Sequence, residues 1–320
     1  MRQRLWMTAG IFLLSCMSAW AVYPERPITL VVPFPAGGPA DALGRAVAQA
    51  MGARLGQSVV VENRVGAGGL VGIASVASAS PEGYVLGMAG TGAMIYAPFI
   101  AKKMPFDPIT GVTHITTLVR TPNVLVVNAN SPFKTLADLV AKAKAEPHRI
   151  TYASAGIASS AHVVGELLQV QAGIKLVHVP YKGGAPAIQD LMGGHVDVMV
   201  AEASGVRGAI RAGTLRALAL SDSARLNVLK EVPAAPEVGL PGWIADGAYG
   251  LVAPLGIATD TLKRLTDAAN EALASPEVIA KFNDMASLTQ PGNSAQYRAL
   301  IKAEQERWAP VIRAAGITAD

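Results

Sequence analysis

The sequence contains one cysteine, few aromatic residues and no long apolar run. Cys16 is the single cysteine among 320 residues, so one chain can form no internal disulfide and no cysteine-based metal site. Aromatic residues make up 5% of the chain, so its core must consist mainly of Ala, Val, Leu and Ile. Stability must therefore come from a hydrophobic core, and the chain is long enough to build two domains.

Charged residues are sparse, and the two signs nearly balance. The chain has 27 basic and 23 acidic residues, and two of the arginines lie within the first 21 residues. Without that segment, 25 basic residues face 23 acidic ones, a net charge of about +2. No run of basic residues interleaved with aromatics indicates a nucleic-acid site. We therefore expect no nucleic-acid partner.

Residues 1–21 have the parts of a secretory signal peptide. A basic beginning precedes an apolar run over residues 5–15, which is shorter than the about 20 residues that a membrane span needs. Ala19 and Ala21 form a small-x-small cleavage pattern. Leu14 is too bulky for a good lipidation signal before Cys16. We expect cleavage after Ala21, no lipid anchor and a periplasmic location.

Short β-branched runs alternate with alanine-rich stretches along most of the chain. Strands are expected at residues 28–32, 59–62, 84–89, 123–128, 150–153, 175–179, 196–200, 215–220 and 250–253. Helices are expected between them at residues 41–55, 71–79, 135–145, 160–172, 186–192 and 206–212. Most of the strands are continuous apolar runs, which is typical of strands covered on both faces. The alternation predicts an α/β fold with mostly parallel sheets.

The C-terminal part has a different character. Three helical segments are expected there, at residues 259–274, 276–285 and 295–315, with no strand between them. Such helices would pack on an existing domain, so we expect the chain to return to its first domain after forming a second. The predicted domains are residues 22–122 with 247–320, and residues 123–246.

A glycine-rich loop joins the first expected strand to the first expected helix. It reads Pro35, Ala36, Gly37, Gly38, Pro39, Ala40 and Asp41. Its glycines permit left-handed backbone and leave room for a ligand. The helix start offers N–H groups and a positive dipole end to an anion. A tight turn in which Asp41 caps the helix would give the same pattern, so both interpretations stay open.

Residues 152–162 form a second junction of this kind. Ser159 and Ser160 can cap the following helix, and their hydroxyls can also donate to an oxygen-rich ligand. His162 falls in the first turn, where the helix dipole disfavours its protonation. Capping serines and a core histidine are the alternatives. Two such junctions facing each other across a cleft would favour anion binding more strongly than either alone.

Other candidate contacts are scattered along the chain. Thr91 is one of them, and Tyr181 could form the wall of a pocket, whereas Lys182 is expected to be solvated. Asp197 is expected to be buried within the strand at residues 196–200. Glu202 comes just after that strand, and strand C-terminal ends face the ligand crevice in open α/β sheets.

The common catalytic and cofactor motifs do not occur in the sequence. The glycine pattern beginning at Gly66 needs glycine at position 71 for a dinucleotide site and has Val71 instead. There is no Walker A loop, no Gly-x-Ser-x-Gly and no His-Glu-x-x-His motif. The five histidines lack metal-ligand spacing. We therefore expect no cofactor, no metal and no catalytic residue.

A series of ordered motifs spans nearly the whole chain. They are Tyr23-Pro-x-Arg-Pro, Val31-Val-Pro-Phe-Pro-Ala-Gly-Gly38, Asn63-Arg-x-Gly-Ala-Gly-Gly69, Pro81-x-Gly-Tyr84, His178-Val-Pro-Tyr-Lys-Gly-Gly184, Gly193-Gly-x-Val-Asp197, Gly213-x-Leu-Arg-Ala-Leu-Ala219 and Gly239-Leu-Pro-Gly242. In these motifs the chain resembles the Bug (TctC-like) receptors, the extracytoplasmic solute-binding proteins of tripartite tricarboxylate transporters.

The resemblance implies a two-domain periplasmic binding protein of type II that closes on a small organic acid. Mono- and dicarboxylates, amino acids and aromatic acids are the candidate ligands, and inner-membrane transporter subunits are the implied partners. In the family, two loops grip a carboxylate through backbone N–H groups and water. Here these loops are residues 36–41 and residues 156–160, from Gly156 to Ser160, with His162 beside the second.

Three positions depart from the family pattern. Ala40 stands where the family usually has Thr or Ser, so a hydroxyl contact is missing, and Ala161 replaces a small polar residue. Ala201-Glu202 stands where Asp-Asn is frequent, and we expect Glu202 to disfavour a dianion and to tolerate an amine or hydroxyl. A sensory receptor for the same ligands is one alternative. A hydrolase or isomerase that uses His162 is another.

Overall fold

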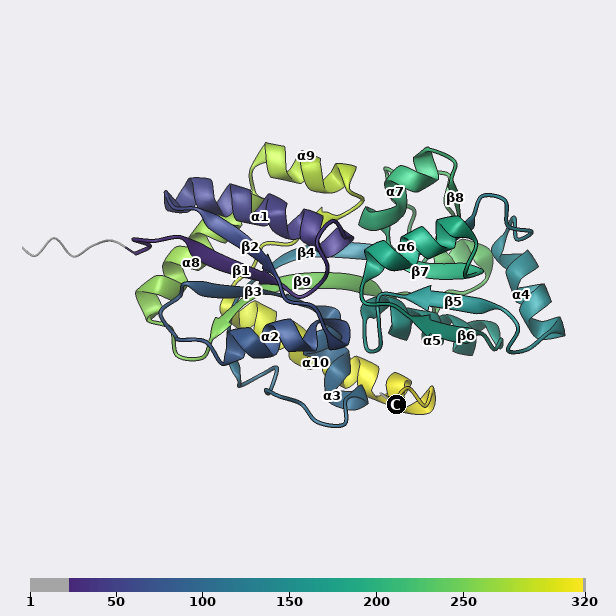
Figure 1. The fold of residues 1–320 in the computed structure, drawn as a ribbon, viewed down its shortest axis with the longest axis horizontal. Coiled ribbons are helices and arrows are strands. Elements are labelled where there is room, and N and C mark those ends of the chain that lie inside the picture. Colours follow the sequence, from purple (N-terminus) through teal and green to yellow (C-terminus); the bar gives the residue numbers. More distant parts are fainter. Residues whose placement is uncertain (1–22, 319–320) are drawn as a thin grey trace, which may run out of the picture.

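The computed structural model describes residues 23–318 and shows two lobes joined side by side (Figure 1). The expected signal peptide, with Cys16 and the cleavage site, lies outside the described residues. The strands are β1 (Ile28–Val32), β2 (Val59–Asn63), β3 (Val85–Gly90), β4 (Val112–Asn128), β5 (Thr151–Ser154), β6 (Val177–Pro180), β7 (Val198–Glu202), β8 (Leu215–Leu220), β9 (Asp246–Pro254) and β10 (Leu288–Thr289).

The helices lie mainly between these strands, as the alternating pattern predicts. They are α1 (Pro39–Leu55), α2 (Leu70–Ala77), α3 (Ala97–Ile100), α4 (Leu136–Ala145), α5 (Ser160–Ala172), α6 (Gly184–Gly193), α7 (Ala203–Arg211), α8 (Thr259–Leu273), α9 (Pro276–Asp284) and α10 (Ser294–Ala314), with the shorter turns η1 (Ala67–Gly69), η2 (Gly92–Tyr96) and η3 (Ala235–Val238). Among the described residues, no helix is both long and apolar enough to cross a bilayer.

A continuous series of paired strands runs through both lobes in the order β2-β1-β3-β9-β4-β7-β5-β6, with β8 and β10 also paired to β4. In the first lobe β1 pairs in parallel with β2 and β3, and in the second lobe β5 pairs in parallel with β6 and β7. The long strand β4 joins the lobes. Its residues 112–122 pair with β9, whereas residues 123–128 pair with β7 and β8.

The expectation of mostly parallel sheets is wrong for the strands that connect the lobes. The pairings of β3 with β9, and of β4 with β7, β8, β9 and β10, are antiparallel. The sequence pattern did not predict β10 or residues 112–122 of β4. Polar residues interrupt the apolar pattern there, but His114 and Thr116 are buried and hydrogen-bond to Pro108 and Asn270. A polar residue with such partners can occupy a buried strand.

The C-terminal helices return to the first lobe, as the sequence predicts. Leu265 of α8 and Phe282 of α9 share a buried cluster with Leu43 and Met51 of α1. The first lobe therefore combines segments from both ends of the chain, which Figure 1 shows as purple and yellow-green elements side by side.

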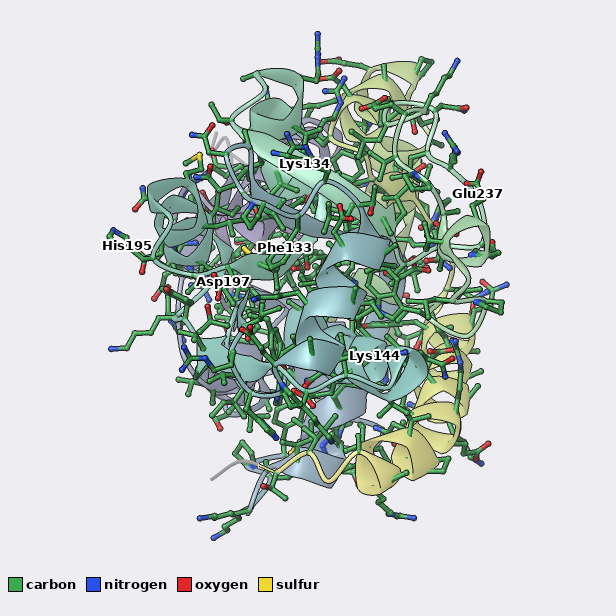
Figure 2. The ribbon with its side chains drawn as sticks, turned by 90° about the vertical axis from the view of Figure 1, so that its right-hand side faces the viewer. Phe133, Lys134, Lys144, His195, Asp197 and Glu237 are labelled. Carbon is green, nitrogen blue, oxygen red and sulfur yellow. The ribbon has the colours of Figure 1, made fainter. Side chains whose placement is uncertain are left out.

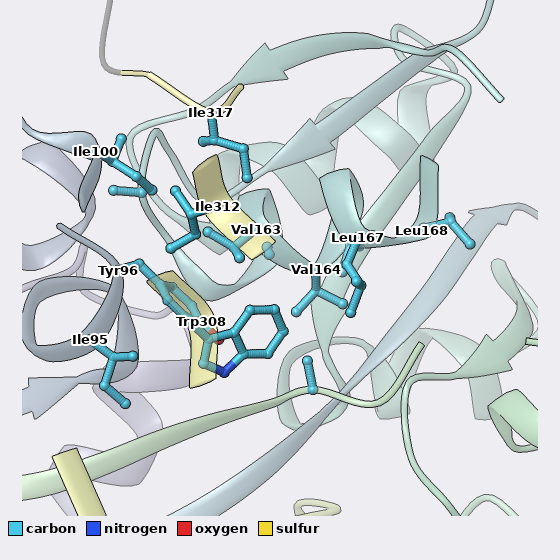
Figure 3. Packing of buried hydrophobic residues seen from close by; sticks show 14 of the residues in the cluster. Ile95, Tyr96, Ile100, Val163, Val164, Leu167, Leu168, Trp308, Ile312 and Ile317 are labelled. Atoms are coloured by element: carbon cyan, nitrogen blue, oxygen red, sulfur yellow. The ribbon is translucent and has the colours of Figure 1, made fainter. Parts of the chain in front are cut away.

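Helix α10 contributes to a core that includes both lobes. Trp308 of α10 is 2% exposed and meets Tyr96 of η2 edge to face, with ring centroids 5.3 Å apart. Val163 and Leu167 of α5, in the second lobe, belong to the same buried cluster (Figure 3). Burial of this apolar surface therefore stabilises the contact between the lobes as well as each lobe.

Asp197 does not lie inside a buried strand, contrary to expectation. Strand β7 begins one residue later, at Val198, and Asp197 is exposed on the end of the second lobe (Figure 2). Its carboxylate accepts hydrogen bonds from the backbone N–H and the hydroxyl of Thr151, each at 2.8 Å. The expected bond to neighbouring backbone is thus present, but at the surface.

Candidate functional site

A cavity lies between the lobes, and main-chain segments of both lobes line it. The lining residues are Phe34, Pro35, Gly38, Pro39, Ala40, Gly68, Gly90, Thr91, Gly92, Ala155, Ser159, Ser160, Ala161, Gly184, Ile188, Met199, Ala201, Glu202, Gly247, Ala248 and Tyr249. The cavity volume is about 40 Å³, which is room for a few water molecules. No lysine or arginine is among the described residues that line it.

The first turn of α1 faces this cavity from the first lobe. Proline at the first helical position suits a helix start, because it has no N–H group to satisfy. The backbone N–H groups of Ala40 and Asp41 have no hydrogen-bond partner among the described residues. They are therefore available to an anion at the positive end of the helix dipole.

The side chain of Asp41 stabilises the loop rather than facing the cavity. Its carboxylate accepts hydrogen bonds from Gly37 N–H and Arg45, both at 2.9 Å, and from Asn63 at 2.9 Å. Burial raises the pKa of Asp41, but the hydrogen bonds from Arg45, Gly37 and Asn63 outweigh it and lower the pKa below its usual value. Because the Gly37 N–H already donates to this carboxylate, it is not available to a ligand. The N–H groups that remain for a ligand are those of the first turn of α1.

The first turn of α5 faces the same cavity from the second lobe. The Ser159 hydroxyl caps the helix by accepting from the His162 N–H at 3.3 Å. The N–H groups of Ser160 and Ala161 have no partner among the described residues. The Ser160 hydroxyl accepts a hydrogen bond from Asn123 at 3.1 Å, and its own proton is available for a ligand. Two helix N-termini thus direct N–H groups at one small volume.

Two stacked histidines support the loop before α5. His162 Nδ1 accepts from the Ala158 N–H at 3.2 Å, and the His178 ring lies parallel to His162 with centroids 4.1 Å apart. His178 Nε2 is 2.7 Å from the Ser154 hydroxyl. Burial lowers the pKa of His162 to about 4 and, together with the charge of His162, that of His178 to about 3. Both rings are neutral at neutral pH and hold the loop.

Acid is expected to destabilise the protein through this pair. The unfolded histidines bind protons below about pH 6.5 while the folded ones do not. The free energy of unfolding should therefore be highest above that pH and fall on acidification, by about 1.4 kcal/mol per pH unit for each histidine. Urea unfolding of wild type and His178→Gln between pH 7 and 5 tests this. The variant should lose less stability, and an exposed-site control, His195→Gln, should follow wild type; equal slopes for all three would contradict the prediction.

The lobes approach each other closely at two glycines beside the cavity. A Cβ at Gly68 would lie 2.5 Å from the carbonyl oxygen of Ile157, and one at Gly92 would lie 2.7 Å from that of Ala158. Gly68 also has φ +62°, which disfavours other residues. Any side chain here would force the first lobe away from the loop that precedes α5.

Comparisons with known proteins show to which family the chain belongs. The family described as "Tripartite tricarboxylate transporter family receptor" matches residues 43–317. The chain belongs to this family. The protein BugT of Bordetella pertussis is 34% identical over 318 residues, which cover 98% of each chain. A protein encoded between tcbD and tcbE in Pseudomonas sp. is 36% identical over 91% of this chain and 86% of its own length.

Solved structures of related receptors have the same fold. The periplasmic binding protein BugD is 32% identical, with a TM-score of 0.89 over 93% of this chain and 100% of its own. MatC from Rhodopseudomonas palustris, solved with bound malate, is 30% identical, with a TM-score of 0.86 over 91% of this chain and 100% of its own. An R. palustris protein solved with adipate is 30% identical, with a TM-score of 0.90 over 93% of this chain and 100% of its own. This chain is therefore a two-domain solute-binding receptor and not an enzyme.

The structure brings part of the expected receptor site together. The expected contacts that line the cavity are Gly38, Pro39, Ala40, Thr91, Ser159, Ser160 and Glu202. Those outside it are Ala36, Gly37, Asp41, Gly156, His162 and Tyr181. The Thr91 hydroxyl is already engaged, because it donates to the Ala248 carbonyl and accepts from the Ala248 N–H.

Two of the expected contacts that lie outside the cavity line an outer groove, which is formed by residues 33–34, 65–69, 155–157 and 180–182. Gly156 and Tyr181 line this groove together with the exposed Lys182. The Tyr181 hydroxyl donates to Asp190 at 2.6 Å. Burial, together with this hydrogen bond, raises the pKa of Tyr181 to about 12. Since His162 lies behind the α5 turn and outside the receptor cavity, it can act there only through the loop that it supports.

Tyr249 lines the receptor cavity but was not predicted from the sequence. The expected strand began at residue 250, one position later, and β9 begins at Asp246. Gly247 and Ala248 line the cavity beside it. The domain boundary expected near residues 246–247 could have indicated these lining residues, because a chain that crosses from one lobe to the other must pass the cleft between them.

Proposed function

We propose that this receptor captures a small organic carboxylate in the periplasm and delivers it to the membrane subunits of a tripartite tricarboxylate transporter. The observation that carries the proposal is the pair of helix N-termini, α1 and α5, whose unpartnered N–H groups face one cavity. The malate and adipate bound by related receptors support the same ligand class.

The physical basis is binding of an anion by fixed dipoles. Each helix N-terminus is equivalent to roughly half a positive charge, and its N–H groups are already oriented. A carboxylate between α1 and α5 would be shared by both lobes, so it would stabilise their approach. No arginine or lysine need be desolvated, because none is among the described residues lining the cavity.

We propose that closure occurs by rotation of the two domains about the crossing strands. The proposed domains are residues 22–122 with 247–320, and residues 123–246. The change of pairing within β4, from β9 to β7 and β8, supports this division. Arg120 bridges Asp246 of β9 and Asp222, which follows β8, so an ion-pair network lies at the crossing. Hinge motion of this kind is common in periplasmic binding proteins.

A ligand that binds only the folded protein raises its melting temperature, so a panel of mono- and dicarboxylates should include members that stabilise it. At a concentration of about 100 times Kd the gain is about 2.7 kcal/mol, or roughly 5 to 11 °C. Ser160→Pro should abolish this shift, because proline suits the first helical position but lacks the N–H group. Ser160→Ala is the matched control that removes the hydroxyl alone. No shift with any acid in the panel would refute the proposal.

A further inference from the structure

Glu202 is a carboxyl group in the cavity with one oxygen unpaired. It ends β7 and precedes α7, but its side chain makes no capping hydrogen bond. Instead its Oε1 accepts from the Tyr249 hydroxyl at 2.5 Å. A Cβ at Gly247 would lie 3.1 Å from the same oxygen, so the absence of a side chain there leaves space for it. Two residues of β9 thus hold Glu202 in the cavity.

The second oxygen, Oε2, is shielded from solvent and has no hydrogen-bond partner among the described residues. The charged groups on the neighbouring segments are paired elsewhere: Arg120 with Asp222 and Asp246, and Arg207 with Asp284. No described ion pair includes Glu202. A shielded carboxyl oxygen without a partner is costly, so a ligand that donates to it gains affinity.

Asn123 links Glu202 to the first turn of α5. Glu202 is the register partner of Asn123 in the pairing of β4 with β7, and the Asn123 amide donates to Ser160 in the first turn of α5. The cavity therefore offers the N–H donors of the helix N-termini at one end and the Glu202 Oε2 acceptor at the other, with Asn123 between Glu202 and α5. A ligand that satisfies both ends must be small and must carry opposite hydrogen-bonding character at its two ends.

We propose that Glu202 makes the cleft selective for a small carboxylate whose other end is a hydrogen-bond donor, an ammonium or hydroxyl group. The inference rests on the proposed carboxylate site and specifies its ligand class. The carboxylate lies at α1 and α5, and the donor binds Glu202 Oε2. A dicarboxylate of the same length would place a second negative charge against Glu202, which requires protonation of one of the two groups.

Three acids share a two-methylene spacer and differ in the group at its far end: 3-hydroxypropanoate, 3-aminopropanoate and succinate. Propanoate, which has no second polar group, completes the panel that separates these effects. Calorimetry at pH 8 should show that wild type binds 3-aminopropanoate at least tenfold more tightly than succinate. In Glu202→Gln the amide donates where Oε2 accepted, so succinate should bind at least as tightly as 3-aminopropanoate. Glu146→Gln, an exposed site on the second lobe, should retain the wild-type order.

The pH dependence provides a second readout. Burial raises the pKa of Glu202 to about 7, although the hydrogen bond from Tyr249 opposes the increase. Between pH 8 and pH 6 the anionic fraction of such a group falls about tenfold. The affinity of wild type for 3-aminopropanoate should fall by about that factor while its affinity for succinate rises. Glu202→Gln should show neither trend.

The outcomes distinguish this inference from the proposed function. If wild type and Glu202→Gln bind the acids in the same order and with the same pH dependence, Glu202 does not select the ligand, and the carboxylate site stands. If wild type binds none of these acids, nor their homologues with one, three or four methylenes, then both the carboxylate site and the role of Glu202 are rejected.

Discussion

Gly205→Ala is expected to weaken carboxylate binding by roughly 5- to 150-fold without destabilising the unliganded protein. Gly205 lies in the first turn of α7 in the second lobe, and a Cβ there would lie 2.3 Å from Cγ of Pro39 in the first lobe. Such overpacking costs about 1–3 kcal/mol, and 1.4 kcal/mol is a tenfold change in Kd. The lobes must separate to relieve the contact, so the cost falls on ligand binding.

The same helix provides a matched control. Gly208 is also in α7, but a Cβ there would meet no atom within 4 Å. Alanine at either position favours the helix by up to about 1 kcal/mol, so both variants should melt at or above the wild-type temperature without ligand. Calorimetry with the carboxylate that stabilises wild type most should show weaker binding in Gly205→Ala alone. Equal affinities in the two variants would show that the contact between Gly205 and Pro39 does not limit closure.

Trp308→Ala is expected to reduce the stability of the protein by about 3–5 kcal/mol. The indole is 2% exposed and packs on Tyr96, and its Nε1 donates to Glu304 at 2.9 Å. Its cluster includes Val163 of the second lobe (Figure 3), so the substitution would open a cavity in the core shared by both lobes. At 2–4 °C per kcal/mol, the melting temperature should fall by roughly 6 to 20 °C.

A less drastic substitution separates packing from the hydrogen bond. Trp308→Phe keeps an aromatic ring against Tyr96 and loses the donor to Glu304. It should cost substantially less than alanine, because most of the apolar contact remains. Thermal unfolding followed by circular dichroism would measure both. If phenylalanine proves as costly as alanine, the bond to Glu304, and not the packing, accounts for the stabilisation.

Much of the fold was predictable because the local signals agree. Continuous apolar runs such as residues 84–89 and 250–253 alternate with helical stretches, and glycines mark the turns between them. The expected strands and helices are therefore present, with ends shifted by a few residues. The first turns of α1 and α5 were predictable for the same reason, since a strand, a glycine-rich turn and a helix are consecutive in sequence.

Elements that depend on distant partners were not predictable in this way. Residues 112–122 of β4 contain buried polar side chains whose hydrogen-bond partners come from elsewhere in the chain. Asp41 and Gly37 were expected at the ligand, but their bond to each other engages both groups. Tyr249 had no local motif, and only the antiparallel pairing of β9 places it beside Glu202.

The sequence alone determined that two helix N-termini follow buried strands, that these junctions contain glycine and serine, and that no disulfide or cofactor motif is present. These are local properties, since propensity, capping and hydrophobic periodicity act over a few residues. Tertiary structure alone decided which N–H groups remain unpartnered, that Gly205 touches Pro39, and that Glu202 keeps one free oxygen in the cavity. Those properties depend on residues far apart in the chain, such as Glu202 and Tyr249 at a separation of 47 positions, and only the tertiary packing brings them into contact.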